Sequence, residues 1–298
     1  MSSKRREGDG EWSGDNFHGM SVYKHYSQEQ LDNQYNTRLL VPDYAEYFER
    51  WEKLSRQTEK EHTVFKNVSY GDHSQETLDI FPAEKTLSKT LVFIHGGYWH
   101  LLDKEMFHFL ASGFLEHNIT TVLINYPLAP HSSIDEIVSS CRRGMQWLQD
   151  NVKRFNGDPS QLYILGHSAG GHLASMLLLE KELKFIKAVI SLSGIFRLEP
   201  IKLSYLNDTI GMDHEAAIRN SPVLITPVND CQLLLVVGSD ETNEFKEQTE
   251  ELYKCWKNKC SSPEFLEIAG KNHYSILDAV VEKESVLHDT IVRLLSSE

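Results

Sequence analysis

Short apolar runs alternate along the chain with stretches of helical spacing. Continuous apolar runs of this length predict strands that are buried on both faces of a sheet, and they cover 91–94, 188–192 and 233–237. Between them, apolar residues recur at three- and four-residue steps, which is typical of amphipathic helices; these stretches cover 103–117, 134–155, 244–256 and 274–295. Strands that alternate with helices in this way predict crossover connections and a mostly parallel sheet.

Two earlier segments have a different pattern. Residues 63–70 and 76–81 alternate between apolar and polar positions and are separated by Gly71-Asp72, which predicts an antiparallel hairpin. Further strands are expected at 120–125, at 265–268 and before Gly166. The pattern therefore predicts an α/β fold with a sheet of about eight strands and helices on both faces.

The two ends of the pattern define the domain organisation. Residues 1–18 are polar and Gly-rich, so we expect a disordered tail. Residues 19–298 are expected to form a single domain, in which 19–60 is a helical extension and 196–230 is an excursion over the sheet, rich in proline and polar residues.

The helical extension has a capping signal and an aromatic stripe. Ser27 and Gln30 form a candidate capping box. Aromatic and apolar residues follow at helical spacing, namely Tyr44, Tyr47, Phe48, Trp51 and Leu54. Such a stripe packs on a core, and here it could also serve as a lid whose aromatic rings line a pocket.

The centre of the chain carries a Gly-x-Ser-x-Gly pentapeptide. Residues 166–170 follow the apolar run 163–165 and precede the helix-forming run 173–180. A strand, a sharp turn and a helix in this order predict a nucleophile elbow with Ser168 exposed on the turn. The alternative is an ordinary strand-to-helix turn with a capping serine.

A serine hydroxyl needs a base, and the base needs a carboxylate to orient it. In this fold the chain order is serine, acid, histidine. Among the later histidines, only His273 follows a strand end and precedes the closing helix. Asp240 follows the run 233–237 and is the predicted acid, with Glu241 and Glu244 as alternatives.

A glycine-rich loop after the strand 91–94 predicts an oxyanion hole, since glycines let backbone N–H groups turn towards a developing oxyanion. The expected donors are Gly97, Tyr98 and Ala169, while Gly96 shapes the turn. His95 and His100 lack a third ligand at useful spacing, so His95 is interpreted as a structural hydrogen-bonding residue, and neither a metal nor another cofactor is expected.

Composition narrows the choice of partners. A formal charge of −13 argues against binding nucleic acid, because phosphates require a basic face. No apolar stretch approaches the roughly 20 residues of a membrane span, and no signal-like segment is seen. The four cysteines lack Cys-x-x-Cys spacing and are expected to be reduced. We therefore expect a soluble cytoplasmic protein that binds neither nucleic acid nor membrane.

Four motifs in order carry a resemblance. The segments 95–97, 125–130, 157–159 and 166–171 resemble the hormone-sensitive-lipase-like esterase group of α/β-hydrolases. Within that group, His95-Gly96-Gly97-Tyr98-Trp99 and residues 29–36 are similar to the arylformamidases, also called kynurenine formamidases. Pro127 departs from the wider esterase group, where an arginine is usual, and this warns against assuming ester substrates.

The resemblance implies hydrolysis of N-formyl-L-kynurenine to L-kynurenine and formate in tryptophan breakdown. Ser168 would form a formyl-serine intermediate, and Tyr98, Trp99 and the N-terminal aromatic residues would line a pocket for the aryl ring of this small-molecule substrate. A short-chain carboxylesterase and a non-catalytic binding protein of the same fold are the alternatives. The sequence does not decide whether the protein forms a homodimer or whether part of it is found in the nucleus.

Overall fold

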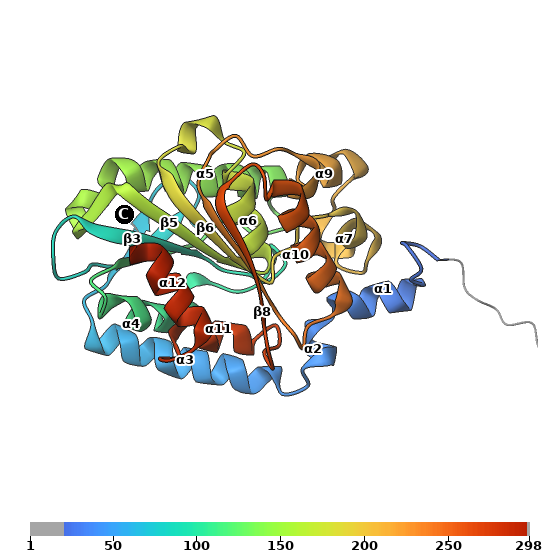
Figure 1. The fold of residues 1–298 in the computed structure, drawn as a ribbon, viewed down its shortest axis with the longest axis horizontal. Helices are drawn as coiled ribbons and strands as arrows, with labels where there is room; N and C mark the ends of the chain where they lie inside the picture. Colours follow the sequence, from blue (N-terminus) through green and yellow to red (C-terminus); the bar gives the residue numbers. More distant parts are fainter. Residues whose placement is uncertain (1–20, 297–298) are drawn as a thin grey trace, which may run out of the picture.

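The protein is built around one twisted sheet of eight strands (Figure 1). The computed structural model describes residues 21–296, so the predicted disordered tail lies outside the described residues. The strands are β1 (Phe65–Ser69), β2 (Thr77–Phe81), β3 (Ser88–Ile94), β4 (Thr120–Ile124), β5 (Gly157–His167), β6 (Ile186–Leu192), β7 (Gln232–Gly238) and β8 (Ser261–Ile268).

The order of the strands is β1-β2-β4-β3-β5-β6-β7-β8. The hairpin of β1 and β2 is antiparallel, as predicted, and β2 pairs antiparallel with β4. All pairs from β4 to β8 are parallel. The predicted, mostly parallel α/β-hydrolase sheet is therefore confirmed. The carboxyl ends of its parallel strands share one edge, where sites of open α/β sheets form.

Helices cover both faces of the sheet (Figure 1). One layer contains α5 (Ile134–Asn151), α6 (Ala169–Leu177) and α10 (Asn243–Trp256), and the other contains α3 (Tyr44–Glu61), α4 (Phe109–Leu115), α11 (Ser275–Val281) and α12 (Val286–Ser296). Alternate residues of β3 belong to different cores: Val92 packs with the first layer and Phe93 with the second. Burial on both faces explains why these strands are continuous apolar runs.

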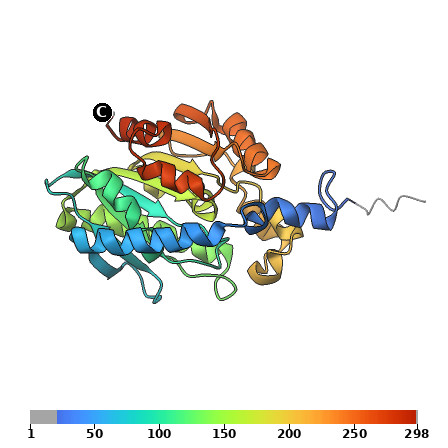
Figure 2. The same cartoon turned by 90° about the horizontal axis from the view of Figure 1, so that it is seen from below.

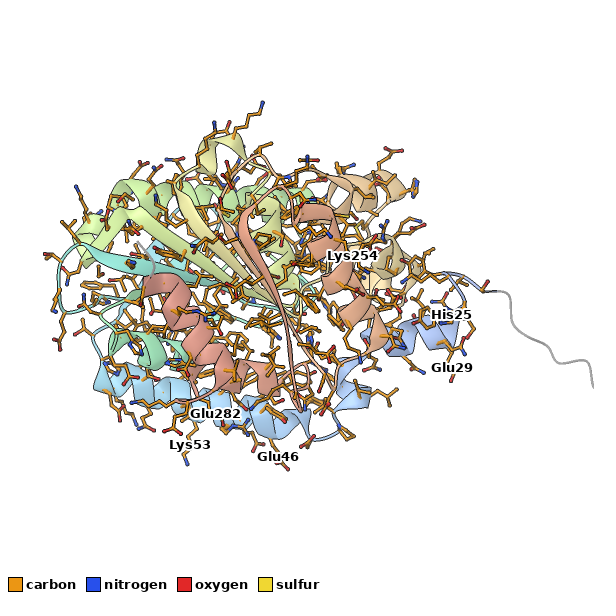
Figure 3. All side chains as sticks on the ribbon, in the orientation of Figure 1. His25, Glu29, Glu46, Lys53, Lys254 and Glu282 are labelled. Atoms are coloured by element: carbon orange, nitrogen blue, oxygen red, sulfur yellow. The ribbon has the colours of Figure 1, made fainter. Side chains whose placement is uncertain are left out.

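The predicted helical extension consists of α1 (Gln28–Tyr35), α2 (Thr37–Leu40) and the long helix α3. The capping box of Ser27 and Gln30 is present at the start of α1. In α3, Trp51 is buried, whereas Glu46 and Lys53 point away from the protein (Figure 3). The apolar stripe of α3 therefore packs on the domain, and Figure 2 shows this helix running along the second layer.

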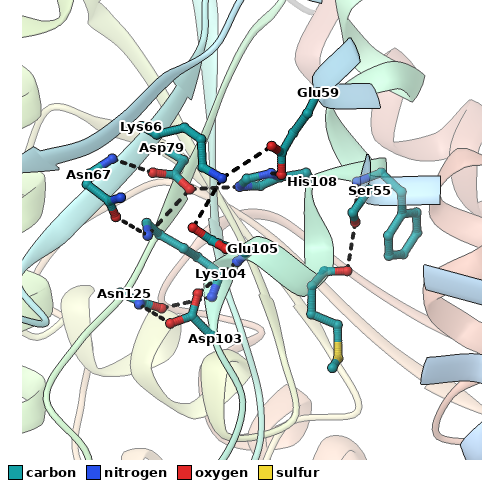
Figure 4. A network of polar contacts seen from close by, with 12 residues as sticks. Ser55, Glu59, Lys66, Asn67, Asp79, Asp103, Lys104, Glu105, His108 and Asn125 are labelled. Atoms are coloured by element: carbon teal, nitrogen blue, oxygen red, sulfur yellow. Dashed lines mark hydrogen bonds and ion pairs between the residues drawn. The ribbon is translucent and has the colours of Figure 1, made fainter. Parts of the chain in front are cut away.

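Hydrogen bonds and ion pairs connect the C-terminal part of α3 to the sheet (Figure 4). His108 lies 2.8 Å from Glu59 of α3 through Nδ1 and 2.8 Å from Asp79 of β2 through Nε2. Lys104 Nζ lies 3.4 Å from the same Asp79 carboxylate. Burial raises the pKa of Asp79, but the hydrogen bond from His108 and the other contacts hold it below its ordinary value. An ionised Asp79 thus connects three segments of the chain.

Two predicted segments differ in detail from the structure. The predicted excursion carries three short helices, α7 (Glu199–Leu203), α8 (Asn207–Ile210) and α9 (His214–Arg219), and α1 packs beside α7 and α10 (Figures 1 and 2). The prediction of a single closing helix over 274–295 is wrong. The helix is interrupted between α11 and α12, where Glu284 has a φ of 70°. In the described range 21–296, no helix is long and apolar enough to cross a bilayer.

Candidate active site

Ser168 occupies a strained turn at the carboxyl end of the central strand β5. Its φ of 56° and ψ of −120° are unfavourable for a residue with a side chain. The turn is tight because its glycines touch backbone: a Cβ on Gly166 would lie 2.1 Å from the Gly170 oxygen, and one on Gly170 would lie 1.9 Å from the Ile94 oxygen. The conformation is that of the predicted nucleophile elbow.

His273 lies beside Glu241. Its Nδ1 is 2.7 Å from Glu241 Oε2, and both side chains are buried. Glu241 Oε1 accepts hydrogen bonds from Ser193 Oγ at 2.5 Å and from the Gly238 N–H at 2.8 Å. A carboxylate next to Nδ1 keeps the proton of a neutral imidazole on that nitrogen and leaves Nε2 as the basic one.

The prediction that Asp240 orients the histidine is wrong in the structure. Asp240 is exposed, and its carboxylate accepts a hydrogen bond from Ser239 Oγ at 2.8 Å. The turn after β7 instead directs Glu241 inward, where the Gly238 N–H holds its carboxylate. Glu244, the other alternative, contacts Lys24 and Tyr35. Glu241, an alternative at the sequence level, is the acid that meets His273.

Two neighbours of His273 were not identified from the sequence. His167 Nε2 donates to the His273 carbonyl oxygen at 2.9 Å, and the Phe245 ring lies 4.5 Å from the imidazole. Burial, followed by the proximity of His273, holds the pKa of His167 well below its ordinary value, so His167 is neutral. A histidine before Ser168 was visible in the sequence, but nothing there indicated that it faces His273.

The glycine-rich loop runs beside the elbow. Gly97, Tyr98 and Trp99 have φ values of 103°, 49° and 60°. At Gly97 a Cβ would lie 2.2 Å from the Leu101 oxygen, so this position requires glycine. At Gly96 a Cβ would lie 3.0 Å from Ser168 Cβ, which places the loop against Ser168. The structure therefore brings the predicted loop and Ser168 together.

Trp99 does not line the pocket as predicted. Its side chain is fully buried, and its Nε1 donates to His172 Nδ1 at 3.2 Å. Because Nδ1 accepts, the proton of His172 resides on Nε2, which donates to the Asn220 carbonyl oxygen at 2.8 Å. Burial lowers the pKa of His172 to about 4. Trp99 thus joins the glycine-rich loop to the elbow helix.

His95 belongs to the frame of the loop. It is buried and stacks on Tyr126 with ring centroids 4.4 Å apart, and its Nδ1 donates to the Gly96 carbonyl oxygen at 2.8 Å. Burial lowers the pKa of His95, in keeping with a neutral ring. His95 therefore forms hydrogen-bonding and stacking contacts, as expected of a structural residue.

Ser168 and His273 open into the same cavity at the carboxyl edge of the sheet. The N-terminal extension contributes part of its wall, including Phe48 and Trp51, and the rest comes from the domain. The lining residues are Thr37, Arg38, Phe48, Trp51, Gly97, Tyr98, Leu101, Leu102, Phe107, His167, Ser168, His273 and Tyr274. The wall is mostly aromatic and aliphatic, which suits an aryl group.

Candidate metal ligands lie elsewhere. Within residues 21–296, Glu116, His117 and His288 offer ligand atoms within 4.8 Å of one another. Glu116 already pairs with Lys283 at 2.7 Å, and His288 Nδ1 donates to the Val280 carbonyl oxygen. None of these residues lines the cavity with Ser168.

Comparisons with known proteins place the chain among hydrolases. The BD-FAE family model matches residues 78–254. The kynurenine formamidase of Danio rerio is 29% identical over 296 residues, which cover 93% of this chain and 99% of that protein. The kynurenine formamidase of Salmo salar is 31% identical and covers 77% of this chain and 81% of that protein.

A solved structure is also similar to this one in fold. That of a proposed thioesterase from Silicibacter sp. tm1040 superposes with a TM-score of 0.80 and 26% identity, over 90% of this chain and 99% of that one. The chain belongs to the kynurenine formamidase family of α/β-hydrolases.

Proposed function

We propose that the protein hydrolyses N-formyl-L-kynurenine to L-kynurenine and formate, a step of tryptophan breakdown. The observation that carries the proposal is the pairing of His273 with Glu241 in the cavity into which the strained Ser168 opens. The kynurenine formamidases that align with 93% and 77% of the chain support the choice of an aryl formamide.

Acylation begins when Ser168 Oγ attacks the formyl carbon and transfers its proton to His273 Nε2. Negative charge moves to the formyl oxygen, which accepts hydrogen bonds from the N–H groups of Gly97, Tyr98 and Ala169. The carbon–nitrogen bond then breaks, and the arylamine nitrogen takes the proton from His273 Nε2. L-kynurenine leaves, and a formyl ester remains on Ser168.

Deacylation uses the same residues in the opposite sense. A water molecule gives a proton to His273 Nε2 and attacks the formyl carbon, and the bond to Ser168 Oγ breaks as that oxygen regains the proton. Formic acid leaves and ionises. Glu241 remains a carboxylate throughout and stabilises the imidazolium that forms twice in each cycle.

The cavity suits the two ends of an aryl formamide. Where other acyl groups carry a carbon chain, the formyl group carries only a hydrogen atom. It therefore fits beside Ser168 even though Gly96 approaches that residue closely. The aryl ring would lie among Phe48, Trp51 and Tyr98, where ring contacts contribute about 0.5–1.5 kcal/mol each beyond burial.

The test is formate release from N-formyl-L-kynurenine by the wild type and by Ser168→Ala. We expect the substitution to lower kcat by roughly 10³-fold or more. Ser175→Ala is the matched control, because Ser175 is a buried serine of the helix α6 that follows Ser168, and its hydroxyl donates to the Gly171 carbonyl oxygen. Undiminished formate release by Ser168→Ala would refute the nucleophile.

The substrate class needs its own comparison. p-Nitrophenyl acetate and butyrate would be assayed beside the formamide, since a short-chain carboxylesterase could use the same nucleophile. We expect kcat/KM for N-formyl-L-kynurenine to exceed that for either ester. A preference for butyrate would replace the formamidase proposal with the carboxylesterase, and inactivity towards all three would favour the non-catalytic binding protein.

A further inference from the structure

Arg38 stands at the junction of two cavities. It lines the cavity that contains Ser168, and it also lines a neighbouring cavity towards α1 and the excursion. Both cavities share Thr37, Tyr98 and Leu101, while Tyr205 and Thr209 belong to the second one alone. A molecule whose ring lies near Ser168 could therefore extend past Arg38 into the second cavity.

The guanidinium of Arg38 has no acidic partner in the structure. None of the ion pairs formed within residues 21–296 includes it, whereas Arg50, Arg197 and Arg219 each pair with a carboxylate. Its charge is instead stacked over the Tyr44 ring, 5.0 Å from the centroid. A hydrogen bond with the Tyr274 side chain uses part of the guanidinium, and its remaining N–H groups can receive an anion.

The backbone at Arg38 is fixed to the catalytic wall. Thr37 Oγ1 and the Tyr274 hydroxyl lie 2.8 Å apart in a buried hydrogen bond, and Tyr274 directly follows the base His273. Asn36 caps the short helix α2, since its Oδ1 accepts from the Leu39 N–H at 3.2 Å. The position of Arg38 is therefore coupled to that of the site.

The charge of Arg38 acts on polar groups of both cavities. Burial lowers the pKa of His100, and the positive charge of Arg38 lowers it further. Burial raises the pKa of Tyr205 and of Tyr274, and the same charge opposes both rises. These groups come from three separate segments, so the field of Arg38 covers the junction.

We propose that Arg38 binds the α-carboxylate of the substrate and so determines specificity for aryl formamides that carry an amino-acid side chain. This inference rests on the proposed function. Arginine suits the task because its planar fork matches a carboxylate with two parallel hydrogen bonds. A local cation also matters because the chain as a whole carries a net charge of −13, which repels an anionic group.

The test compares two substrates that share the formanilide and differ in the amino-acid end. N-formyl-L-kynurenine carries the carboxylate, and 2′-formamidoacetophenone lacks it. We expect Arg38→Gln to lower kcat/KM for the first substrate by roughly 10- to 100-fold, mainly through KM. For the second substrate the same variant should stay within about twofold of the wild type.

Two further variants sharpen the comparison. Arg38→Lys keeps the charge but loses the fork, so it should recover only part of the selectivity. Arg56→Gln is the matched control, because Arg56 is an exposed arginine that pairs with Glu52 and lines neither cavity. It removes the same charge from the protein and should behave like the wild type on both substrates.

The outcomes separate the two proposals. If Arg38→Gln loses activity equally on both substrates, or on neither, the carboxylate contact is overturned while the formamidase activity stands. If the wild type releases formate from neither substrate, the proposed function fails and the inference fails with it. Binding of L-kynurenine and of 2′-aminoacetophenone to Ser168→Ala gives a readout without turnover, and Arg38→Gln in that background should weaken only the former.

Discussion

Glu241 Oε2 lies 2.7 Å from His273 Nδ1, and the adjacent Asp240 is exposed to solvent. The two neighbouring carboxylates therefore give a direct test of which one orients the base. Glu241→Gln leaves the size of the side chain unchanged but removes its charge, so we expect kcat to fall by roughly 10³- to 10⁴-fold. Asp240→Asn should keep kcat within about twofold of the wild type.

Glu241→Asp provides the conservative comparison. The shorter side chain retains the charge but must reach His273, Ser193 and the Gly238 N–H from a backbone set for glutamate. We expect an intermediate loss of roughly tenfold in kcat. Formate release measured at pH 7 checks all three variants, and a larger loss in Asp240→Asn than in Glu241→Gln would contradict the assignment.

The hydrogen bond between Trp99 and His172 predicts a second effect. Trp99→Phe leaves the buried His172 Nδ1 without its donor, which should lower the free energy of unfolding by about 1–3 kcal/mol. Because the bond ties the glycine-rich loop to α6, kcat should fall as well. Denaturant unfolding and formate release measure the two effects. Trp147→Phe is the control, since Trp147 lies on α5 and lines neither cavity.

Trp51 is held in the cavity wall by Asp278, which accepts from its Nε1 at 2.7 Å and also pairs with Arg50. Asp278→Ala should therefore loosen α3, lower the free energy of unfolding by about 1–3 kcal/mol and raise KM more than it lowers kcat. Arg50→Gln removes only the more exposed ion pair, which should change stability by less than about 1 kcal/mol. If Asp278→Ala and Arg50→Gln raised KM equally, the hydrogen bond between Trp51 and Asp278 would not be what positions α3.

Stability should fall in mild acid because His172 is buried and neutral. Its pKa is lowered from 6.5 to about 4, so the unfolded chain binds a proton first as the pH drops. The full stability is present above pH 6.5 and is lost progressively down to about pH 4, by about 3 kcal/mol for this residue. Denaturant midpoints measured between these pH values check the slope, and His172→Gln should flatten it.

Local pattern was sufficient to predict most of the elements and the strained turn at Ser168. Runs such as 91–94 are apolar at every position because both faces of the strand are covered, and that property is visible without coordinates. That Ser168 and His273 share one cavity was also predictable, since both follow the carboxyl ends of parallel strands. The break before α12 was missed because its residues, Glu282 to Ser285, contain neither glycine nor proline.

The choice between Asp240 and Glu241 was decided by tertiary structure. Both are carboxylates that directly follow β7, so the sequence pattern does not distinguish them. Glu241 turns inward because Ser193, at the end of β6, and the Gly238 N–H bind its second oxygen. Such contacts join strands that are distant in sequence, so no local pattern carries them.

The sequence by itself determined the α/β-hydrolase sheet, the turn at Ser168, the place of His273 after the last strand and the glycine-rich loop, because each depends on the period or order of residues along the chain. Only the tertiary structure decided that Glu241 meets His273, that Trp99 turns to His172 and that Arg38 faces two cavities. These depend on side-chain direction and on neighbours from other segments, which are set when the layers pack together.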